Sequence, residues 1–167
     1  MVEIDQVTGE AHQVKLTDFG LSKIIVPGEI MMESCGTPAY VAPEVLHKEG
    51  YGKEVDIWST GVILYTMIAR ALPFHSQDKK KTFQLIKTAD PDLESEIWQT
   101  IGEDCKNLIR KMLIKDPTKR ITIDEALKHP WFVKYKEYIQ GIKTKYHPRL
   151  DEESGLILKP NALRKSS

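Results

Sequence analysis

The sequence has few of the features of a secreted, membrane-embedded or nucleic-acid-binding protein. Its 167 residues include only 2 cysteines, too few for a disulfide framework, which favours an intracellular, cytoplasmic setting. The 24 basic and 24 acidic side chains cancel, so overall charge does not indicate a nucleic-acid-binding or membrane-surface protein. The longest apolar run, Val62–Ala69, is far too short to span a bilayer. The N-terminus also lacks the basic and apolar stretches of a signal peptide.

The composition is that of an ordinary globular domain, with 41% hydrophobic and 29% charged residues, so a packed core is expected. Alternating apolar residues around a Thr-Gly-Glu turn predict a β-hairpin within residues 2–17. Residues 18–54 contain many glycines and prolines and show no long periodicity. Irregular segments of this length in compact domains are usually functional.

The remainder of the chain predicts helices. Residues 56–70 are almost all apolar, which predicts a helix that is buried on every side. Ser76 is the expected cap of a helix that ends near residue 88. Apolar residues recur at helical spacing over 101–113, and Thr122–Glu125 has the sequence of a capping box. We therefore expect a mainly helical body.

Several short motifs occur in a fixed order. Asp18-Phe19-Gly20 directly follows a predicted strand, and Gly36-Thr37-Pro38 and Ala42-Pro43-Glu44 come later in the irregular segment. They are followed by Asp56-Ile57-Trp58, Asp116-Pro117-Thr118-Lys119-Arg120 and His129-Pro130-Trp131-Phe132. In this order, the motifs resemble the C-terminal lobe of eukaryotic Ser/Thr protein kinases, and most closely those of the calcium/calmodulin-dependent group.

The resemblance covers about Val14 to Phe132. It implies the mainly α C-terminal lobe of a protein-kinase-like α+β fold, with a β-hairpin and an activation segment at its N-terminal end. Residues 1–135 would form a partial kinase domain, and 136–167 a basic, partly disordered extension. The implied reaction is ATP-dependent phosphoryl transfer to protein Ser or Thr hydroxyls.

The family motif implies roles for Asp18, Phe19 and Gly20 at the cofactor. Asp18 resembles the carboxylate that holds Mg²⁺ on the phosphates of ATP. Phe19 would pack beneath it, and Gly20 would allow an unusual backbone conformation. The alternatives are a solvated turn aspartate and an ordinary core phenylalanine.

Other family positions would contact the protein substrate. Thr37 resembles the threonine that orients the catalytic base and the substrate hydroxyl, and its sequence context points to Ser/Thr specificity. The alternative is a turn hydroxyl. Ser34, Pro38 and Val41 occupy the positions that form the pocket for the residue after the phosphoacceptor.

The resemblance also implies structural roles. Glu44 and Arg120, distant in sequence, resemble a buried ion pair that closes the activation segment. Asp56 is expected to open and cap the buried helix and to brace the catalytic loop. Ile63 and Met67 would anchor the apolar columns that reach the nucleotide.

Two segments suggest regulation. Glu33 stands where the family commonly has an activation-loop phosphosite, so it either substitutes in part for a phosphate or is a solvated loop carboxylate. Ser34 is a possible phosphosite. Residues 134–149 form a basic amphipathic pattern that suits calmodulin, an autoinhibitory contact, or simply a last helix with a solvated face.

Several parts of a kinase active site are not in the sequence. No Gly-x-Gly-x-x-Gly occurs, and none of the 17 residues before Asp18 reads as His-Arg-Asp. We therefore expect these 167 residues to be inactive alone and to bind neither ATP nor Mg²⁺ tightly. Two interpretations stay open: a piece of an active Ser/Thr kinase, or a non-catalytic kinase-lobe scaffold that binds other proteins.

Overall fold

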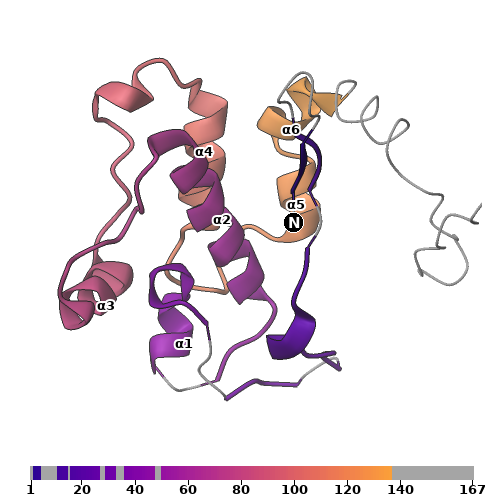
Figure 1. The fold of residues 1–167 in the computed structure, drawn as a ribbon, viewed down its shortest axis with the longest axis vertical. Helices are drawn as coiled ribbons and strands as arrows, with labels where there is room; N and C mark the ends of the chain where they lie inside the picture. Colours follow the sequence, from indigo (N-terminus) through magenta and orange to yellow (C-terminus); the bar gives the residue numbers. More distant parts are fainter. Residues whose placement is uncertain are drawn as a thin grey trace, which may run out of the picture. The chain divides into compact units, whose positions relative to one another are not determined.

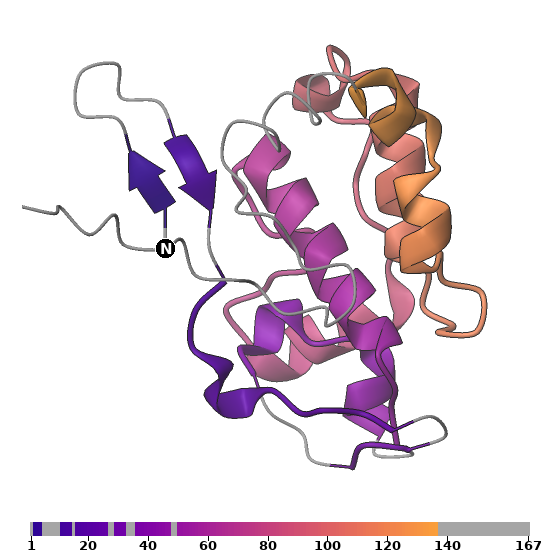
Figure 2. The same ribbon diagram turned by 90° about the vertical axis from the view of Figure 1, so that its right-hand side faces the viewer.

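The computed structural model describes residues 2–4, 11–14, 16–26, 29–32, 36–47 and 50–136. The chain divides into two compact units, one made of residues 1–18 with 135–167 and the other of Phe19–Lys134. In the first unit, strands β1 (Val2–Ile4) and β2 (Ala11–Val14) pair antiparallel, with Val2 opposite Val14 (Figure 2). The predicted hairpin is therefore present.

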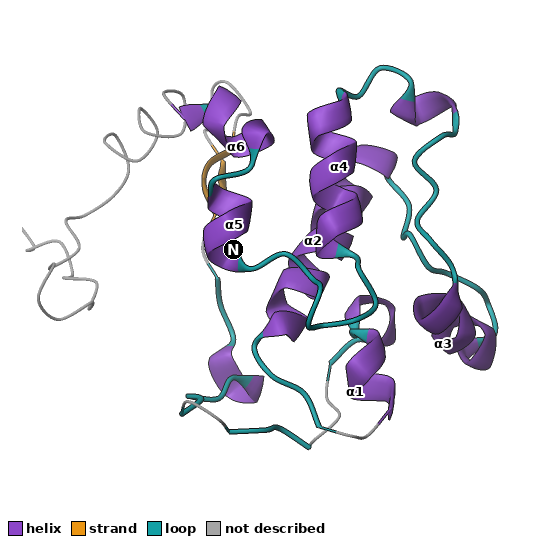
Figure 3. Ribbon diagram, turned by 180° about the vertical axis from the view of Figure 1, so that it is seen from behind, coloured by secondary structure: helices purple, strands orange, loops and turns teal. Residues whose placement is uncertain are grey.

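The second unit is helical throughout its regular elements (Figures 1 and 3). Its helices are α1 (Pro43–His47), α2 (Glu54–Ala69), α3 (Lys79–Thr88), α4 (Glu103–Met112), α5 (Ile123–Leu127) and α6 (Pro130–Lys134). Short 3-10 turns lie at Phe19–Leu21, Pro38–Tyr40 and Glu96–Trp98. The mainly helical body predicted from the sequence is confirmed.

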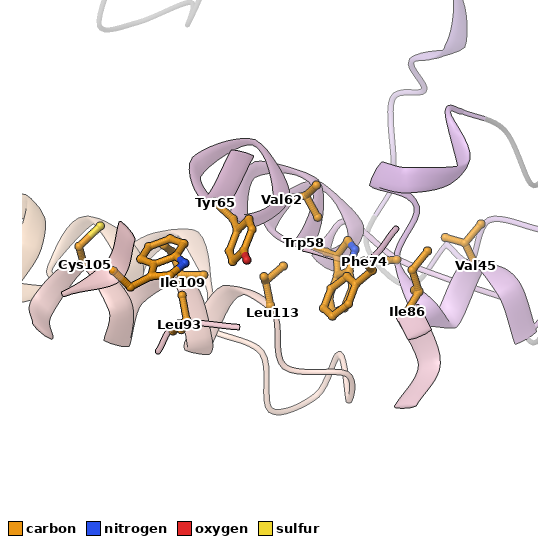
Figure 4. Packing of buried hydrophobic residues seen from close by; sticks show 12 residues of the cluster. Val45, Trp58, Val62, Tyr65, Phe74, Ile86, Leu93, Cys105, Ile109 and Leu113 are labelled. Atoms are coloured by element: carbon orange, nitrogen blue, oxygen red, sulfur yellow. The ribbon is translucent and has the colours of Figure 1, made fainter. Parts of the chain in front are cut away.

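Helix α2 contributes Trp58, Val62 and Tyr65 to the core (Figure 4). Its Trp58 stacks on Phe74 with the ring centroids 5.6 Å apart, and its Tyr65 lies 4.9 Å from the ring of Trp98. Gly61 lets α4 approach closely, because a Cβ at this position would lie 2.8 Å from the Cβ of Met112. The close packing of α2 and α4 fixes the centre of the unit.

The expectation that this apolar helix is buried on every side is wrong. Trp58 and Val62 are fully buried, whereas Ile63 is 49% exposed and Met67 is 74% exposed. Ile63 and Met67 therefore lie on a face of α2 that the described residues leave largely uncovered.

Two predicted helix starts also need correction. The cap of α3 is Asp78, whose carboxylate accepts a hydrogen bond from the backbone N–H of Lys80; Ser76 instead accepts one from the N–H of Asp78. Helix α2 begins at Glu54, so Asp56 lies inside its first turn and does not open it.

Two other predictions from spacing hold. The amphipathic pattern over 101–113 corresponds to α4, which buries Cys105, Leu108, Ile109 and Met112. Thr122 and Glu125 form both bonds of the predicted capping box at the start of α5. None of the helices in the described ranges has both the length and the hydropathy that crossing a bilayer requires.

Candidate functional site

Arg120 makes an extensive set of hydrogen bonds within the second unit. It lies between α4 and α5, and its two terminal nitrogens donate to the two carboxylate oxygens of Glu44 at 2.6 and 2.8 Å. Its remaining N–H groups donate to the backbone carbonyls of Ile114, Lys115 and Glu54 at 3.0, 3.2 and 2.8 Å. A guanidinium has five N–H donors, so all of them are used.

This ion pair is buried and joins distant parts of the chain. The side chain of Arg120 is 0% exposed and that of Glu44 is 10% exposed. The guanidinium also lies 5.2 Å from the centroid of the Trp58 ring, against the buried face of α2. The structure thus brings together Glu44 and Arg120, and fixes the start of α1 to the loop that follows α4.

The segment before α1 is held by a backbone bridge. Met31 and Tyr51 exchange two N–H to C=O hydrogen bonds, each of 2.9 Å. Gly50 has a φ of +93°, and a Cβ there would lie 2.2 Å from a methyl carbon of Ile30. Glycine is therefore required where the two loops meet.

A cavity of about 320 Å³ lies between this segment and the start of α2. Thr37, Val41 and Asp56, three of the residues singled out from the sequence, all line it. The other lining residues are Leu21, Ser22, Lys23, Ile25, Met31, Gly36, Tyr40, Ala42, Val45, Tyr51, Val55 and Ser59. Pro38 starts the 3-10 turn beside Thr37 but does not line the cavity.

The hydroxyl of Thr37 does not hydrogen-bond to the 3-10 turn Pro38–Tyr40 that follows it. The backbone there is fixed instead by Ser59, whose hydroxyl donates to the carbonyl of Tyr40 at 3.0 Å. Thr37 is exposed, so its hydroxyl remains available at the cavity.

Asp56 also lines the cavity, but it is not the N-cap residue of α2. Lys53 precedes α2 and makes no side-chain cap. Asp56 is exposed in the first turn, where an acidic side chain is favoured by the helix dipole. Its backbone carbonyl accepts a hydrogen bond from the hydroxyl of Thr60 at 2.7 Å.

Asp18 has an unusual backbone conformation. It belongs to the first unit and has a φ of +62°, in the left-handed region that non-glycine residues rarely adopt. Such strain is concentrated at functional positions. In the second unit, Phe19 and Gly20 begin a 3-10 turn. Phe19 is 67% exposed, so within the described residues it is neither part of the core nor packed beneath another side chain.

Some predicted positions cannot be placed. Glu33 and Ser34 lie outside the described residues, as does nearly all of the basic stretch 134–149.

Lys115 is a notable residue that the sequence did not single out. Its Nζ lies 4.0 Å from the centroid of the Phe74 ring and 5.0 Å from that of Trp58. The atom is buried, without a hydrogen-bond partner in the described part of the chain. Burial lowers the pKa of Lys115 to about 8; Asp90 opposes this effect and Arg120 adds to it. No local pattern distinguishes this lysine, because both rings come from distant positions.

Comparison with known sequences identifies the family. The family described as "Protein kinase domain" matches residues 5–132, most of the chain. This chain belongs to the protein kinase family. The matched residues contain all the motifs from Asp18-Phe19-Gly20 to His129-Pro130-Trp131-Phe132 that were named above.

Curated serine/threonine kinases resemble this kinase chain closely. Calcium-dependent protein kinase 29 of Arabidopsis thaliana is 50% identical over 127 residues, which are 76% of this chain and 24% of that protein. Calcium-dependent protein kinase 11 of Oryza sativa subsp. japonica is 48% identical over 73% of this chain and 21% of its own length. Probable serine/threonine-protein kinase fhkC of Dictyostelium discoideum is 42% identical over 84% of this chain and 25% of its own length.

The chain therefore spans about a quarter of these relatives. Kinases of this family generally use ATP with Mg²⁺. The described residues contain no group of three or more His, Cys, Asp or Glu side chains that could hold a metal alone. Mg²⁺ usually takes one or two carboxylates together with substrate phosphates, so a single carboxylate could contribute to such a site without a cluster of this kind.

Proposed function

We propose that this protein is a serine/threonine protein kinase, and that the 167 residues supply the C-terminal-lobe part of its active site. The observation that carries the proposal is the protein kinase match over residues 5–132, which contains the kinase motifs in order. The cavity lined by Thr37, Val41 and Asp56 supports it, because two positions with expected catalytic or substrate roles meet there with the residue expected to brace the catalytic loop.

In this proposal, each residue has a defined task. Asp18 would hold Mg²⁺, which neutralises charge on the phosphates during transfer. Thr37 would orient the substrate hydroxyl and the catalytic base, and Asp56 would brace the catalytic loop.

Val41, with Pro38 and Ser34, would contact the residue after the phosphoacceptor. The Glu44–Arg120 pair would fix the end of the activation segment so that these contacts keep their positions.

Transfer by these 167 residues alone is not expected. The sequence has no Gly-rich phosphate loop and no His-Arg-Asp, so groups that cover the phosphates and accept the hydroxyl proton are missing from it. A second candidate function is a kinase lobe that binds other proteins without catalysis. The two candidates differ in whether the lobe supports transfer once the missing groups are supplied.

A chimera distinguishes the two candidates. The segment of Arabidopsis calcium-dependent protein kinase 29 that matches this chain is replaced by this chain's own sequence, and phosphate transfer from ATP to a serine peptide is measured with calcium present. The kinase proposal predicts transfer, with a loss of about 100-fold or more in Asp18→Asn, because the metal ligand is removed. A folded chimera without transfer would favour the scaffold function.

We further propose that Glu33 supplies part of the negative charge of an activation-loop phosphate. Glutamate has one charge and phosphate nearly two, so the effect is weaker than phosphorylation. Glu33→Ala is therefore expected to lower the activity of the chimera, and Glu33→Gln to lower it equally. Unchanged activity in both variants would assign Glu33 to a solvated loop.

The basic stretch 134–149 is proposed to contact calmodulin or a calmodulin-like module, or to act as an autoinhibitory segment, within the cytoplasm. The names of the calcium-dependent relatives support a calcium-linked regulator. Calcium-dependent binding of calmodulin to a peptide of residues 134–149 would support the first possibility; inhibition of the chimera by the same peptide would support the second.

A further inference from the structure

A second cavity, of about 420 Å³, is lined by residues from the end of α4, the loop after it, and the α5–α6 region. Three lysines line it, Lys111, Lys119 and Lys128, against one carboxylate, that of Glu125. Among the residues that the structure describes, none with a role in phosphoryl transfer lines this cavity. It is therefore separate from the candidate site described above.

The single carboxylate is already committed to the fold. Glu125 accepts hydrogen bonds from the backbone N–H and the hydroxyl of Thr122, each of 2.8 Å, as part of the capping box. These bonds, followed by smaller effects of Lys111 and Lys128, lower the pKa of Glu125. Glu125 thus stays ionised and bonded to the start of α5.

Two of the three lysines are free to meet an external anion. Lys119 pairs with Asp116 at 3.3 Å. Lys111 and Lys128 form no close ion pair with any residue in the described ranges, and both are exposed. Glu125, whose pKa both of them lower, is already hydrogen-bonded to Thr122.

His129 forms a neutral wall of the cavity. Its Nδ1 accepts a hydrogen bond from the N–H of Trp131 at 3.3 Å, and its Nε2 lies 3.0 Å from the side-chain oxygen of Asn107. Both ring nitrogens are thus used within the fold, with the proton on Nε2. Burial, and next the charge of Lys111, lowers the pKa of His129, which keeps the ring neutral near pH 7.

The remaining lining is apolar, from Ile114, Ile121 and Pro130. No Phe, Tyr or Trp of the described residues lines the cavity, so this lining offers no stacking surface of the kind on which single-stranded nucleic acids depend. Ammonium groups beside an apolar lining match a peptide that has carboxylates next to an aliphatic side chain.

We propose that this cavity is a docking site for an acidic peptide segment of a partner protein. Lys111 and Lys128 bind the carboxylates of the peptide, and Ile114 and Ile121 contact its aliphatic side chain. The site acts independently of phosphoryl transfer, so its test uses binding alone. The probe is a fluorescein-labelled peptide of glutamates interrupted by leucines, titrated with the full chain and followed by fluorescence anisotropy.

The double variant Lys111→Gln/Lys128→Gln is expected to bind the probe about tenfold or more weakly, because two charge-assisted contacts are lost. The matched control Lys80→Gln/Lys87→Gln removes the same charge from α3, outside the cavity, and is expected to bind within about twofold of wild type. All four lysines are exposed, so neither variant is expected to unfold.

Changes in the probe test the peptide chemistry. Replacing the leucines of the peptide by serines is expected to weaken its binding. If binding were purely electrostatic, this replacement would leave the affinity unchanged. Three outcomes would overturn the proposal: no binding by the wild-type chain, equal weakening in the two double variants, or tighter binding of an oligouridylate of the same charge.

Discussion

At the scale of single residues, Arg120 shows how sequence and structure differ in what they reveal. Its pairing with Glu44 was expected from motif order, since a planar fork suits a carboxylate in a buried place. The three backbone carbonyls that it also binds, including that of Glu54 at the start of α2, have no sequence signal. Any peptide carbonyl can accept such a bond, so only the fold selects them.

Replacing Arg120 by alanine is expected to lower the free energy of unfolding by about 3–5 kcal/mol, because the carboxylate of Glu44 is left buried and unpaired. Urea denaturation followed by Trp fluorescence measures this loss. Arg110→Ala is the control: Arg110 pairs with Glu94 and Glu103 at the exposed surface, and its loss should cost no more than about 1 kcal/mol. Equal losses in the two variants would contradict the role given to the buried pair.

Because the pKa of Lys115 is lowered in the fold, the free energy of unfolding is expected to change with pH in the alkaline range. This pKa is about 8 in the fold, against 10.5 for an ordinary lysine. The unfolded chain therefore holds more protons between these values, and the contribution of Lys115 to stability rises as pH increases from about 8 to 10.5.

Lys115→Met keeps a long side chain between the two rings and removes the charge. The variant is expected to be more stable than wild type at pH 7, and its advantage should shrink by pH 9.5. Thermal unfolding of both proteins at the two pH values measures this. An advantage that is the same at both pH values would show that Lys115 is not a buried, strained ammonium.

At the scale of elements, the accuracy of the sequence predictions followed the strength of the periodicity. The apolar residues of helix α4 recur at helical spacing, so its position and its buried face were both predictable. Helix α2 is apolar almost throughout, and its sequence could not show that Ile63 and Met67 are exposed while Trp58 is buried. Ser76 and Asp78 are both good cap residues two positions apart, and only the geometry separates them.

The segment 16–26 is expected to be much less protected than α2 in native-state hydrogen exchange. Leu16, Phe19, Leu21 and Ile24 are all more than half exposed, whereas α2 is anchored by the buried Trp58. Few buried apolar contacts give a low free energy of local opening. Mass spectrometry of exchanged peptides provides the measurement, and protection equal to that of residues 58–65 would contradict this account.

At the scale of the whole molecule, the order of the motifs was enough to predict the family and the helical lobe. Spacing alone could not place the cavity lined by Thr37 and Asp56, because its walls come from a loop and a helix that only folding brings together. The lysine-lined cavity beyond α4 was also outside the reach of motif reasoning, since exposed lysines follow no pattern that identifies a site.

The 167 residues alone are expected to bind ATP–Mg²⁺ only weakly, with a dissociation constant of about 1 mM or more, since no Gly-rich loop is present to hold the phosphates. Isothermal titration, with intact Arabidopsis calcium-dependent protein kinase 29 as the positive control, measures this affinity. Micromolar binding by the 167 residues would mean that a nucleotide site exists within them.

The central claim is that this sequence works as the catalytic-lobe part of a serine/threonine kinase. Its most direct test is phosphoamino-acid analysis of a protein substrate labelled from radioactive ATP by the chimera described above, with its Asp18→Asn variant alongside. The account predicts phosphoserine and phosphothreonine from the chimera, no phosphotyrosine, and almost no label from the variant. Phosphotyrosine as the main product, or full labelling by Asp18→Asn, would contradict it.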